Sequence, residues 1–309
     1  MTDALVEFLA ATVRIASPLL FAALGGILSE RAGVFAVGLE GMMLAGAFAG
    51  VVATYGTGMV LAGLLASVAG GMLLAAVVAA ATTRFRADQM VTGLAVNVLA
   101  LGLTSFLLRG FGARGEASII RVATLPPLPV PWLADLPLVG PVLFRQPALT
   151  YVAAALTVAM FVLLVRTRAG LTLRAVGENP TAVFAVGGDP ARVRVTAVVA
   201  GGALAGLAGA VLSLQQVGTF TDGMTHGRGY LALAAIIVGR WMPGGALVGC
   251  LVFGAADALQ LRVQGLRLPV SSYVVQMLPY LVSLAMLAGL GRTARLPAAI
   301  GAPFVRDRR

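Results

Sequence analysis

Residues 174–195 read RAVGENPTAVFAVGGDPARVRV, a polar stretch rich in turn residues that lies between two long apolar runs. Its two Asx-Pro pairs, at 179–180 and 189–190, each place a side-chain acceptor before a proline, as at a helix N-cap followed by the first helical residue. Two helices are therefore expected to begin here. The glycines at 187–188 offer the positive φ angles that end a helix, so the first helix has about two turns. The stretch predicts a short capped helix that lies outside a membrane.

The rest of the chain is strongly apolar. Of its 309 residues, 59% are hydrophobic and only 11% are charged, which lies outside the range of soluble globular domains. Because about 20 apolar residues in a helix cross the hydrocarbon core of a bilayer, the sequence predicts an all-α integral membrane protein. We expect a polytopic helical bundle of about eight to ten transmembrane segments. Eight apolar runs are visible, near 5–28, 33–54, 59–81, 90–108, 148–165, 195–216, 230–261 and 271–290.

The arginines predict which segments face the cytoplasm. All 22 basic residues are arginine, and they are densest in the loop 166–194 and in the tail 292–309, with Arg84 and Arg86 in a shorter loop. Basic residues collect in cytoplasmic segments of membrane proteins, so both the loop and the tail are expected in the cytoplasm. The net charge of +10 then reflects orientation in the lipid membrane, and no nucleic-acid polymer is expected as a partner.

The chain is expected to form a single transmembrane domain, 1–309. Its parts are a first half (1–108), an external loop (109–147), the cytoplasmic loop (166–194), a second half (195–291) and the basic cytoplasmic tail (292–309). The external loop has too many prolines for a helix, so it is expected to be an extended cap over the outer mouth.

Two apolar segments resemble each other and carry a polar break: SERAGVFAVGLEGMMLAGAFAG at 29–50 and HGRGYLALAAIIVGRWMPGGALVGCLVFG at 226–254. Paired broken helices in the two halves of a membrane protein indicate a substrate path at the interface of an internal repeat. We therefore expect two pseudo-symmetric halves with interrupted helices. If each break separates two crossings, the chain has ten crossings and both termini are cytoplasmic. This count is preferred because the tail is rich in arginine.

Polar side chains inside the apolar runs are candidates for the path, because ionisable groups there cost a few kcal/mol to insert. Glu40 lies at the first break and Arg240 at the second, so the two can pair across the breaks. Such groups either satisfy backbone left open by the breaks or contact substrate, and both alternatives stay open. The candidates for the substrate path are Glu40, Asn97, Gln215, Gln216, Asp257 and Gln260.

The inventory of reactive residues argues against catalysis by this chain. It has one histidine, His226, and one cysteine, Cys250. Neither a Cys/His metal cluster, nor a Ser-His-Asp set, nor a phosphate loop ending in Lys-Ser/Thr can be assembled from the sequence. We expect no catalytic residue, no metal site, no bound cofactor and no ATP hydrolysis, so energy for transport comes from an ion gradient or from a partner.

Four stretches together resemble a known family. They are GGILSERAGVFAVGLEGMML (25–44), RAVGENPTAVFAVGGDPARVR (174–194), AGGALAGLAGAVLSL (200–214) and GRGYLALAAIIVGRWMPGGALVGCLVFGAADALQ (227–260). They are similar to the permease subunits of bacterial nucleoside-type ABC importers, in the group that includes ribose and simple-sugar permeases. The similarity covers nearly the whole chain and is weakest in 109–147. It implies a multi-pass protein of the bacterial cytoplasmic (inner) membrane that forms a path for nucleosides, with ribose-like sugars as the alternative.

The resemblance also implies partners. In this family the loop that matches 166–194 docks on a cytoplasmic ABC ATPase, which binds ATP and magnesium, so the short helix is implied to be a coupling helix. A second permease subunit, homologous or identical, and an extracytoplasmic substrate-binding protein are implied as well. The alternative outside the family is an ion-coupled secondary transporter, for which Glu40 and Asp257 are the available membrane carboxylates. The implied coupling residues are Arg174, Glu178, Asn179, Pro180, Thr181, Phe184 and Asp189.

Overall fold

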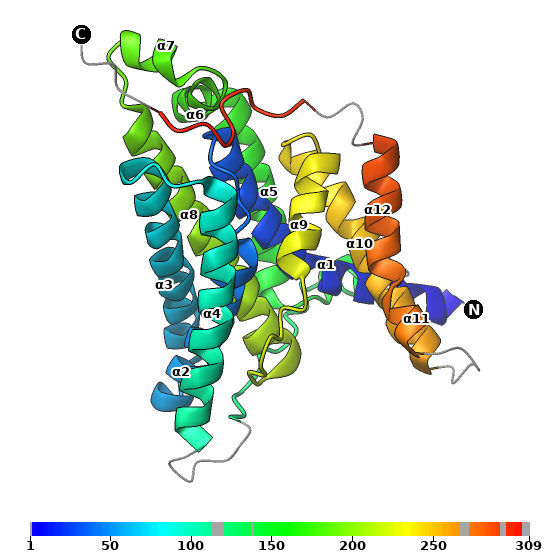
Figure 1. Cartoon of the computed structure of the whole chain (residues 1–309). Helices are drawn as coiled ribbons and strands as arrows, with labels where there is room; N and C mark the ends of the chain where they lie inside the picture. Colours follow the sequence, from blue (N-terminus) through cyan, green and yellow to red (C-terminus); the bar gives the residue numbers. More distant parts are fainter. Residues whose placement is uncertain (1, 113–119, 137–138, 266–271, 291–294, 305–309) are drawn as a thin grey trace.

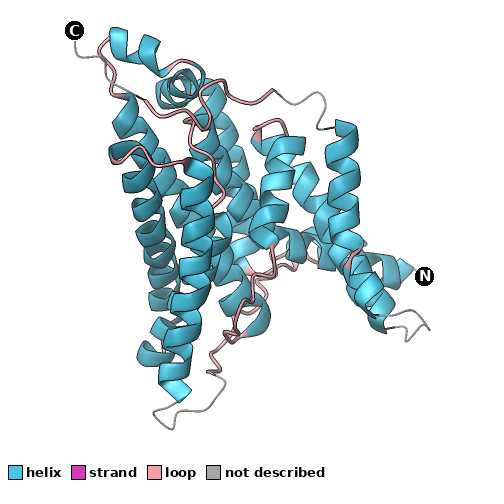
Figure 2. Ribbon diagram, viewed as in Figure 1, coloured by secondary structure: helices cyan, strands magenta, loops and turns pink. Residues whose placement is uncertain are grey.

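The computed structural model describes residues 2–112, 120–136, 139–265, 272–290 and 295–304. Within this part the chain is helical, and loops join the helices (Figure 2). The helices are α1 (Thr2–Arg31), α2 (Leu39–Thr57), α3 (Val60–Ala79), α4 (Gln89–Gly112), α5 (Ala148–Arg166), α6 (Arg168–Glu178), α7 (Pro180–Ala185), α8 (Pro190–Ala210), α9 (Arg228–Val238), α10 (Pro243–Gly265), α11 (Ser272–Gln276) and α12 (Leu278–Leu290). Three π-helical segments, η1 (Ala80–Arg84), η2 (Gly140–Phe144) and η3 (Val211–Val217), complete the set, and η1 and η3 extend α3 and α8.

Among the described residues, seven helices are long and apolar enough to cross a membrane. They are α1 to α5, α8 and α10, with α3 and α8 counted together with their π-helical extensions. Two shorter apolar helical segments, Arg228–Val238 and Val274–Gly289, bring the number in the described residues to nine. The expected all-α polytopic bundle is confirmed, with one helix fewer than the preferred count of ten.

The start of α1 and the described part of the tail, 295–304, lie far apart in the molecule (Figure 1). The end that carries Arg84, α6 and α7 is called the arginine-rich end below. The tail lies there, since the backbone N–H of Ala299 donates to the carbonyl of Gly177 at 2.8 Å. Near the N-terminus, the carbonyl of Ala4 accepts a hydrogen bond from Arg262 in the last turn of α10, at the other end. Ten crossings would place both termini on the cytoplasmic side, whereas nine described apolar helices lie between these two contacts, so the side of the membrane that each end faces stays a prediction.

The two halves repeat one order of elements. In α1 to α4 and again in α8 to α12, a long helix leads into a non-helical connection, at 32–38 or 218–227, and then into a helix that begins inside the molecule. Figure 1 shows that α1 rises toward the arginine-rich end while α8 descends from it, so the halves are inverted. Each broken stretch spans a break between two helices: the first runs from the end of α1 across the 32–38 connection into α2, and the second holds α9 and the start of α10.

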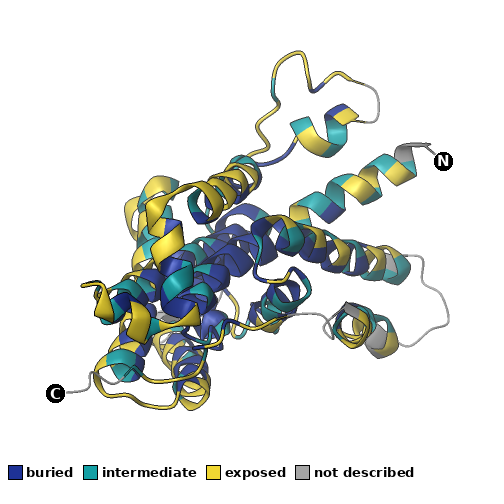
Figure 3. Cartoon of the chain, turned by 90° about the horizontal axis from the view of Figure 1, so that it is seen from above, coloured by how far each residue is buried: buried dark blue, intermediate teal, exposed yellow. Residues whose placement is uncertain are grey.

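The core forms where α8 packs against α1, α2 and α3, and Figure 3 shows the buried residues gathered in the middle of the bundle. Small residues allow this contact: a Cβ added to Gly206 would lie 2.1 Å from the carbonyl oxygen of Ser67. Such close backbone approach stabilises helix pairs in lipid, where the hydrophobic effect between helices is absent.

The described part of the 109–147 loop is mainly irregular, and it packs on the end of η3 away from the arginine-rich end. The N–H groups of Val122 and Leu125 donate to the carbonyls of Gly218 and Leu214, each at 2.9 Å. Residues 113–119 and 137–138 of this loop lie outside the described residues.

Candidate functional site

The short helix α7 has the two ends that its sequence predicts. The Asn179 Oδ1 atom accepts a hydrogen bond from the N–H of Ala182 at 2.9 Å, which caps the helix start. Gly187 follows the helix with a φ of +85°. Asp189 caps α8 in the same way, accepting from the N–H groups of Ala191 at 3.1 Å and Arg192 at 3.2 Å. Because the first N–H groups of a helix lack intrahelical partners, these caps keep a helix of six residues from fraying.

A further helix, α6, lies beside α7 and is not among the helices expected from the sequence. Thr167 caps it, since its Oγ1 atom accepts from the N–H of Gly170 at 3.1 Å. Gly170, Leu173 and Val176 are buried at a spacing of three residues. A threonine cap followed by this helical spacing is the signal that could have identified α6.

The C-terminal tail covers α6 and α7. The Oε2 atom of Glu178 accepts from the N–H of Ala298 at 3.4 Å, and the rings of Phe184 and Phe304 lie 5.8 Å apart. These two members of the expected coupling set thus contact the chain's own tail. Thr181 on α7 is exposed, so it is available to a partner.

The remaining coupling candidates lie around the same surface. Asn179 and Asp189 act as the caps described above, and Pro180 and Arg174 are half-buried. The buried Nε atom of Arg174 has no hydrogen-bond partner among the described residues. Beside α7, a hollow of about 620 Å³ is lined by Thr83, Arg84, Arg86, Phe184, Gly188, Asp189, Ala191 and Phe304.

Arg194 connects this surface to the membrane part of the chain. Arg194 is only 2% exposed, although it belongs to the arginine-rich loop 166–194, which is expected to face the solvent. The guanidinium donates to the carbonyls of Ala299 at 3.3 Å and Ala302 at 2.8 Å in the tail, and to that of Ala32 at 3.2 Å. Ala32 begins the 32–38 connection, so one buried side chain of α8 holds both the tail and this connection.

The turn after α9 lies level with the end of α1. Arg31 donates from Nε to the carbonyl of Trp241 at 2.9 Å and from Nη2 to that of Arg240 at 3.3 Å. The buried carboxylate of Glu30 accepts from the Trp241 indole N–H. A helix of 11 residues such as α9 is about 16 Å long, roughly half of the 30 Å hydrocarbon core. The first residue of α9 therefore lies near mid-depth in the membrane.

Glu40 lies at this depth and caps the start of α9. Its Oε1 atom accepts from the N–H of Gly227 at 2.7 Å, and its Oε2 atom accepts from the N–H of Gly229 at 2.6 Å. The close approach requires glycine, because a Cβ on Gly229 would lie 2.7 Å from the Cα of Glu40. The predicted pair of Glu40 with Arg240 is wrong. Arg240 follows the opposite end of α9, whereas a carboxylate favours the N-terminal end with its unpaired N–H groups.

Asn97 fixes the 32–38 connection against α4. Its Oδ1 atom accepts from the N–H of Gly41 at 2.8 Å, and its Nδ2 atom donates to the carbonyl of Val37 and to the Tyr230 hydroxyl, both at 2.9 Å. Non-helical backbone at membrane depth needs such internal partners. Glu40 and Asn97 also line a cavity of about 280 Å³, together with Gly41, Leu44, Val98, Leu101, Gly223, Thr225, His226 and Tyr230.

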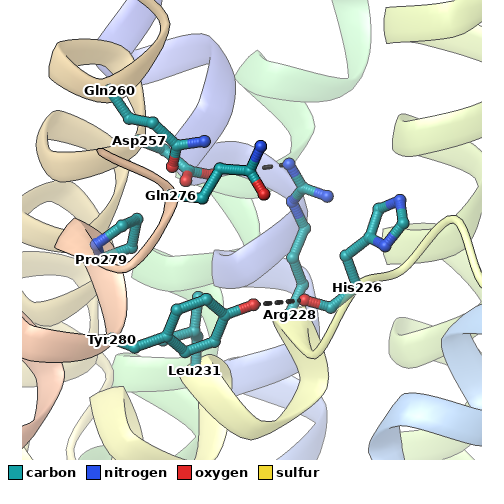
Figure 4. A pocket seen from close by; sticks show the side chains of 8 residues that line it. All are labelled: His226, Arg228, Leu231, Asp257, Gln260, Gln276, Pro279 and Tyr280. Atoms are coloured by element: carbon teal, nitrogen blue, oxygen red, sulfur yellow. Dashed lines mark hydrogen bonds and ion pairs between the residues drawn. The ribbon is translucent and has the colours of Figure 1, made fainter. Parts of the chain in front are cut away.

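The other path candidates lie in two more cavities. Asp257 and Gln260 line one of about 360 Å³ on the other flank of α9 (Figure 4). Gln215 and Gln216 lie near the external loop, beside a cavity of about 460 Å³. Gln216 donates to the carbonyl of Arg14 at 3.0 Å there. The structure thus brings the predicted residues together in pairs, and His226 lines both cavities beside α9.

Inverted halves, helix starts that meet at mid-depth and polar cavities around them define a polytopic membrane transport protein. The chain belongs to the family described as branched-chain amino acid transport system / permease component, whose profile matches residues 8–289.

Relatives share most of its length. A guanosine ABC transporter permease protein of Bacillus subtilis is 36% identical over 97% of this chain and 96% of its own. A nucleoside ABC transporter permease protein of Lactococcus lactis subsp. cremoris is 34% identical over 94% of each chain. A putative glucose ABC transporter permease protein of Haloferax volcanii is 40% identical over 84% of this chain and 78% of its own. No solved structure matches the chain.

Proposed function

We propose that this chain is the membrane subunit of an ABC importer and forms a translocation path for nucleosides. The observation that carries the proposal is α7, a capped helix held on α6 and the tail at the arginine-rich end, with Val186 85% exposed beside it. A helix that transmits force must stay folded when pushed, and the two caps and the tail provide that rigidity. The names of the guanosine and nucleoside relatives support the substrate.

The proposed complex contains four kinds of component. A cytoplasmic ABC ATPase docks on the exposed face of α7 around Thr181 and Ala185 and binds the ATP and magnesium, which this chain does not. A second permease, homologous or identical, completes the path. An extracytoplasmic binding protein delivers the nucleoside at the end with the external loop. The complex is placed in the bacterial cytoplasmic (inner) membrane.

Within the chain, the proposed path passes the cavities beside α9. Substrate enters past Gln215 and Gln216 and reaches the mid-depth level of Glu40 and Asn97, with Asp257 and Gln260 on the other flank of α9. The hydrogen bonds of Glu40 and Asn97 hold the helix starts in place, so these residues shape the path as well as line it.

The experiment is uptake of labelled guanosine into proteoliposomes that contain the permease, its partner permease, the ATPase and the binding protein. We expect accumulation that requires ATP, survives collapse of proton and sodium gradients, and is lost at micromolar guanosine when the binding protein is omitted. Accumulation by the isolated chain driven by an ion gradient would contradict the proposal and favour an ion-coupled secondary transporter.

A sugar is the second candidate substrate, because two relatives are named as glucose permeases, one of them as putative. The same proteoliposomes distinguish the two. If glucose or ribose is accumulated and guanosine is not, the importer is a sugar importer, with the same partners and the same role for α7.

A further inference from the structure

The cavity between α9, α10 and α12 combines polar groups from separate parts of the second half. Its volume of about 360 Å³ lies in the range of small-molecule sites. Figure 4 shows Asp257, Gln260 and Gln276 together on one side, with Arg228 and His226 on the other and Tyr280 below. The lining residues are His226, Arg228, Leu231, Asp257, Gln260, Gln276, Pro279 and Tyr280.

Several of these polar groups have unused hydrogen-bonding capacity. The Nε atom of Arg228 is buried and has no partner among the described residues. No hydrogen bond joins the side-chain amide of Gln260 or of Gln276 to another described residue. Each amide offers two donors and an acceptor; Gln260 is half-buried and Gln276 exposed, while the buried Nε atom of Arg228 is costly to leave unmatched inside a membrane. The cavity is therefore built for a ligand that both donates and accepts hydrogen bonds.

The charges in the cavity balance. Arg228 and Asp257 form an ion pair at 3.5 Å, with their side chains 24% and 17% exposed. The positive N-terminal end of α9 is already occupied by the carboxylate of Glu40. Neither an anion nor a cation finds an unpaired opposite charge here, so the arrangement favours a neutral ligand.

One side of the cavity is apolar and held in place. Leu231 and Pro279 lie beside the ring of Tyr280, whose hydroxyl donates to the carbonyl of His226 at 2.8 Å. His226 has a φ of +44°, a conformation that non-glycine residues adopt only when their surroundings hold them. The hydrogen bond from Tyr280 thus fixes the turn that leads into α9, and the wall offers a rigid surface to a ring.

We propose that this cavity is a binding site for a neutral, hydrogen-bonding ring compound of the nucleoside class, with Gln260 and Gln276 as its specificity-determining residues. This inference rests on the proposed function and adds to it a site on the permease itself. A branched-chain amino acid fits less well, because its charged ends would have to break the Arg228–Asp257 pair while its apolar side chain left both amides unmatched.

The test measures binding of labelled guanosine to the purified complex of permease and ATPase without the binding protein, by scintillation proximity. We expect saturable binding that excess unlabelled guanosine displaces and that the same excess of leucine leaves in place. The double variant Gln260→Met/Gln276→Met keeps the side-chain size and removes the amides, so it should weaken binding at least tenfold. The matched control is Gln264→Met, one turn further along α10 and outside the cavity, with wild-type affinity expected.

Two results would overturn the site: no saturable guanosine binding to the wild-type complex, or equal affinity in the double variant and the wild type. Displacement by leucine as effective as that by guanosine would overturn the ligand class. ATP-dependent guanosine uptake by the complete proteoliposomes tests the proposed function separately. Uptake without binding to the permease–ATPase complex would reject the site and leave the importer function standing.

Discussion

Glu40 shows how one carboxylate can organise two helix starts within a membrane. It is the second residue of α2, and its two oxygens accept the N–H groups of Gly227 and Gly229 at the start of α9. The sequence identifies Glu40 as important because a charge inside an apolar run is costly. It does not identify the partner, because the positions of Gly227 and Arg240 at opposite ends of α9 follow from tertiary structure.

Replacing Glu40 with Gln is expected to destabilise this junction. The amide oxygen can accept one of the two N–H groups, but the amide nitrogen then faces the other, which stays unpaired at a cost of about 2 kcal/mol. We expect a lower midpoint of thermal unfolding in detergent and lower guanosine uptake per assembled complex. Glu7→Gln removes the same charge at an exposed position of α1 and serves as the control. Equal unfolding midpoints in the two variants would show that Glu40 does not hold the helix starts.

Arg194 gives a second prediction at this scale. In Arg194→Met the side chain loses three hydrogen bonds to carbonyls, two of them in the tail, and hydrogen bonds to charged groups are each worth about 1.5–3 kcal/mol. The tail should detach more often, so we expect trypsin to cleave at the exposed Arg295 about tenfold faster or more. Arg192→Met, on the exposed side of the same helix, should leave cleavage unchanged. Unchanged cleavage in Arg194→Met would mean that other contacts hold the tail.

Among the helices, those whose starts are set by a capping residue and its next few neighbours were the most predictable from the sequence. The starts of α7 and α8 follow from Asn179 and Asp189, because a cap uses only the next few residues. Thr167 and the spacing of the apolar residues after it carry the same kind of signal for α6. By contrast, the contact of Phe184 with Phe304 joins positions 120 residues apart (304 − 184), and no local pattern encodes it. This is why the coupling surface was predicted without the tail that covers part of it.

The cap of α7 can be tested directly. Asn179→Ala removes the acceptor for the Ala182 N–H, which typically costs about 1 kcal/mol, a large fraction of the stability of a six-residue helix. We expect more ATP hydrolysed per guanosine imported in proteoliposomes, with normal assembly of the complex. Asn179→Asp keeps a capping acceptor and should behave as the wild type. Ala182→Pro deletes the capped N–H itself and should uncouple more strongly. Normal coupling in both Asn179→Ala and Ala182→Pro would argue against a lever role for α7.

For the whole molecule, composition alone predicts the membrane class, because hydrophobic residues make up 59% of the chain. The number of membrane crossings is harder to predict from the sequence. The 32–38 connection and α9 each traverse only part of the membrane, and hydropathy does not distinguish a partial traverse from a full one. The N–H of Phe35 donates to Oε1 of Gln89 at 2.7 Å, and Nε2 of Gln89 donates to the carbonyl of Gly33 at 3.3 Å. The residue that satisfies this backbone is more than 50 positions away in the sequence. Side chains distant in sequence thus decide whether the apolar run at the first break forms one crossing or two.

The nine-helix arrangement makes a prediction about sidedness. Leu5, 56% exposed, lies near the N-terminus, and Ala87 lies in the exposed connection between α3 and α4 beside Arg84 and Arg86. The native Cys250 is fully buried, so single cysteines can be introduced without removing it, and the wild type serves as the unlabelled control. A membrane-impermeant maleimide applied to intact spheroplasts should label Leu5→Cys and should label Ala87→Cys only after permeabilisation, because basic segments stay in the cytoplasm. If both cysteines require permeabilisation, the termini share one side and the chain has an even number of crossings. If Ala87→Cys alone is labelled in intact spheroplasts, the arginine-rich end faces outward, and α7 cannot reach a cytoplasmic ATPase.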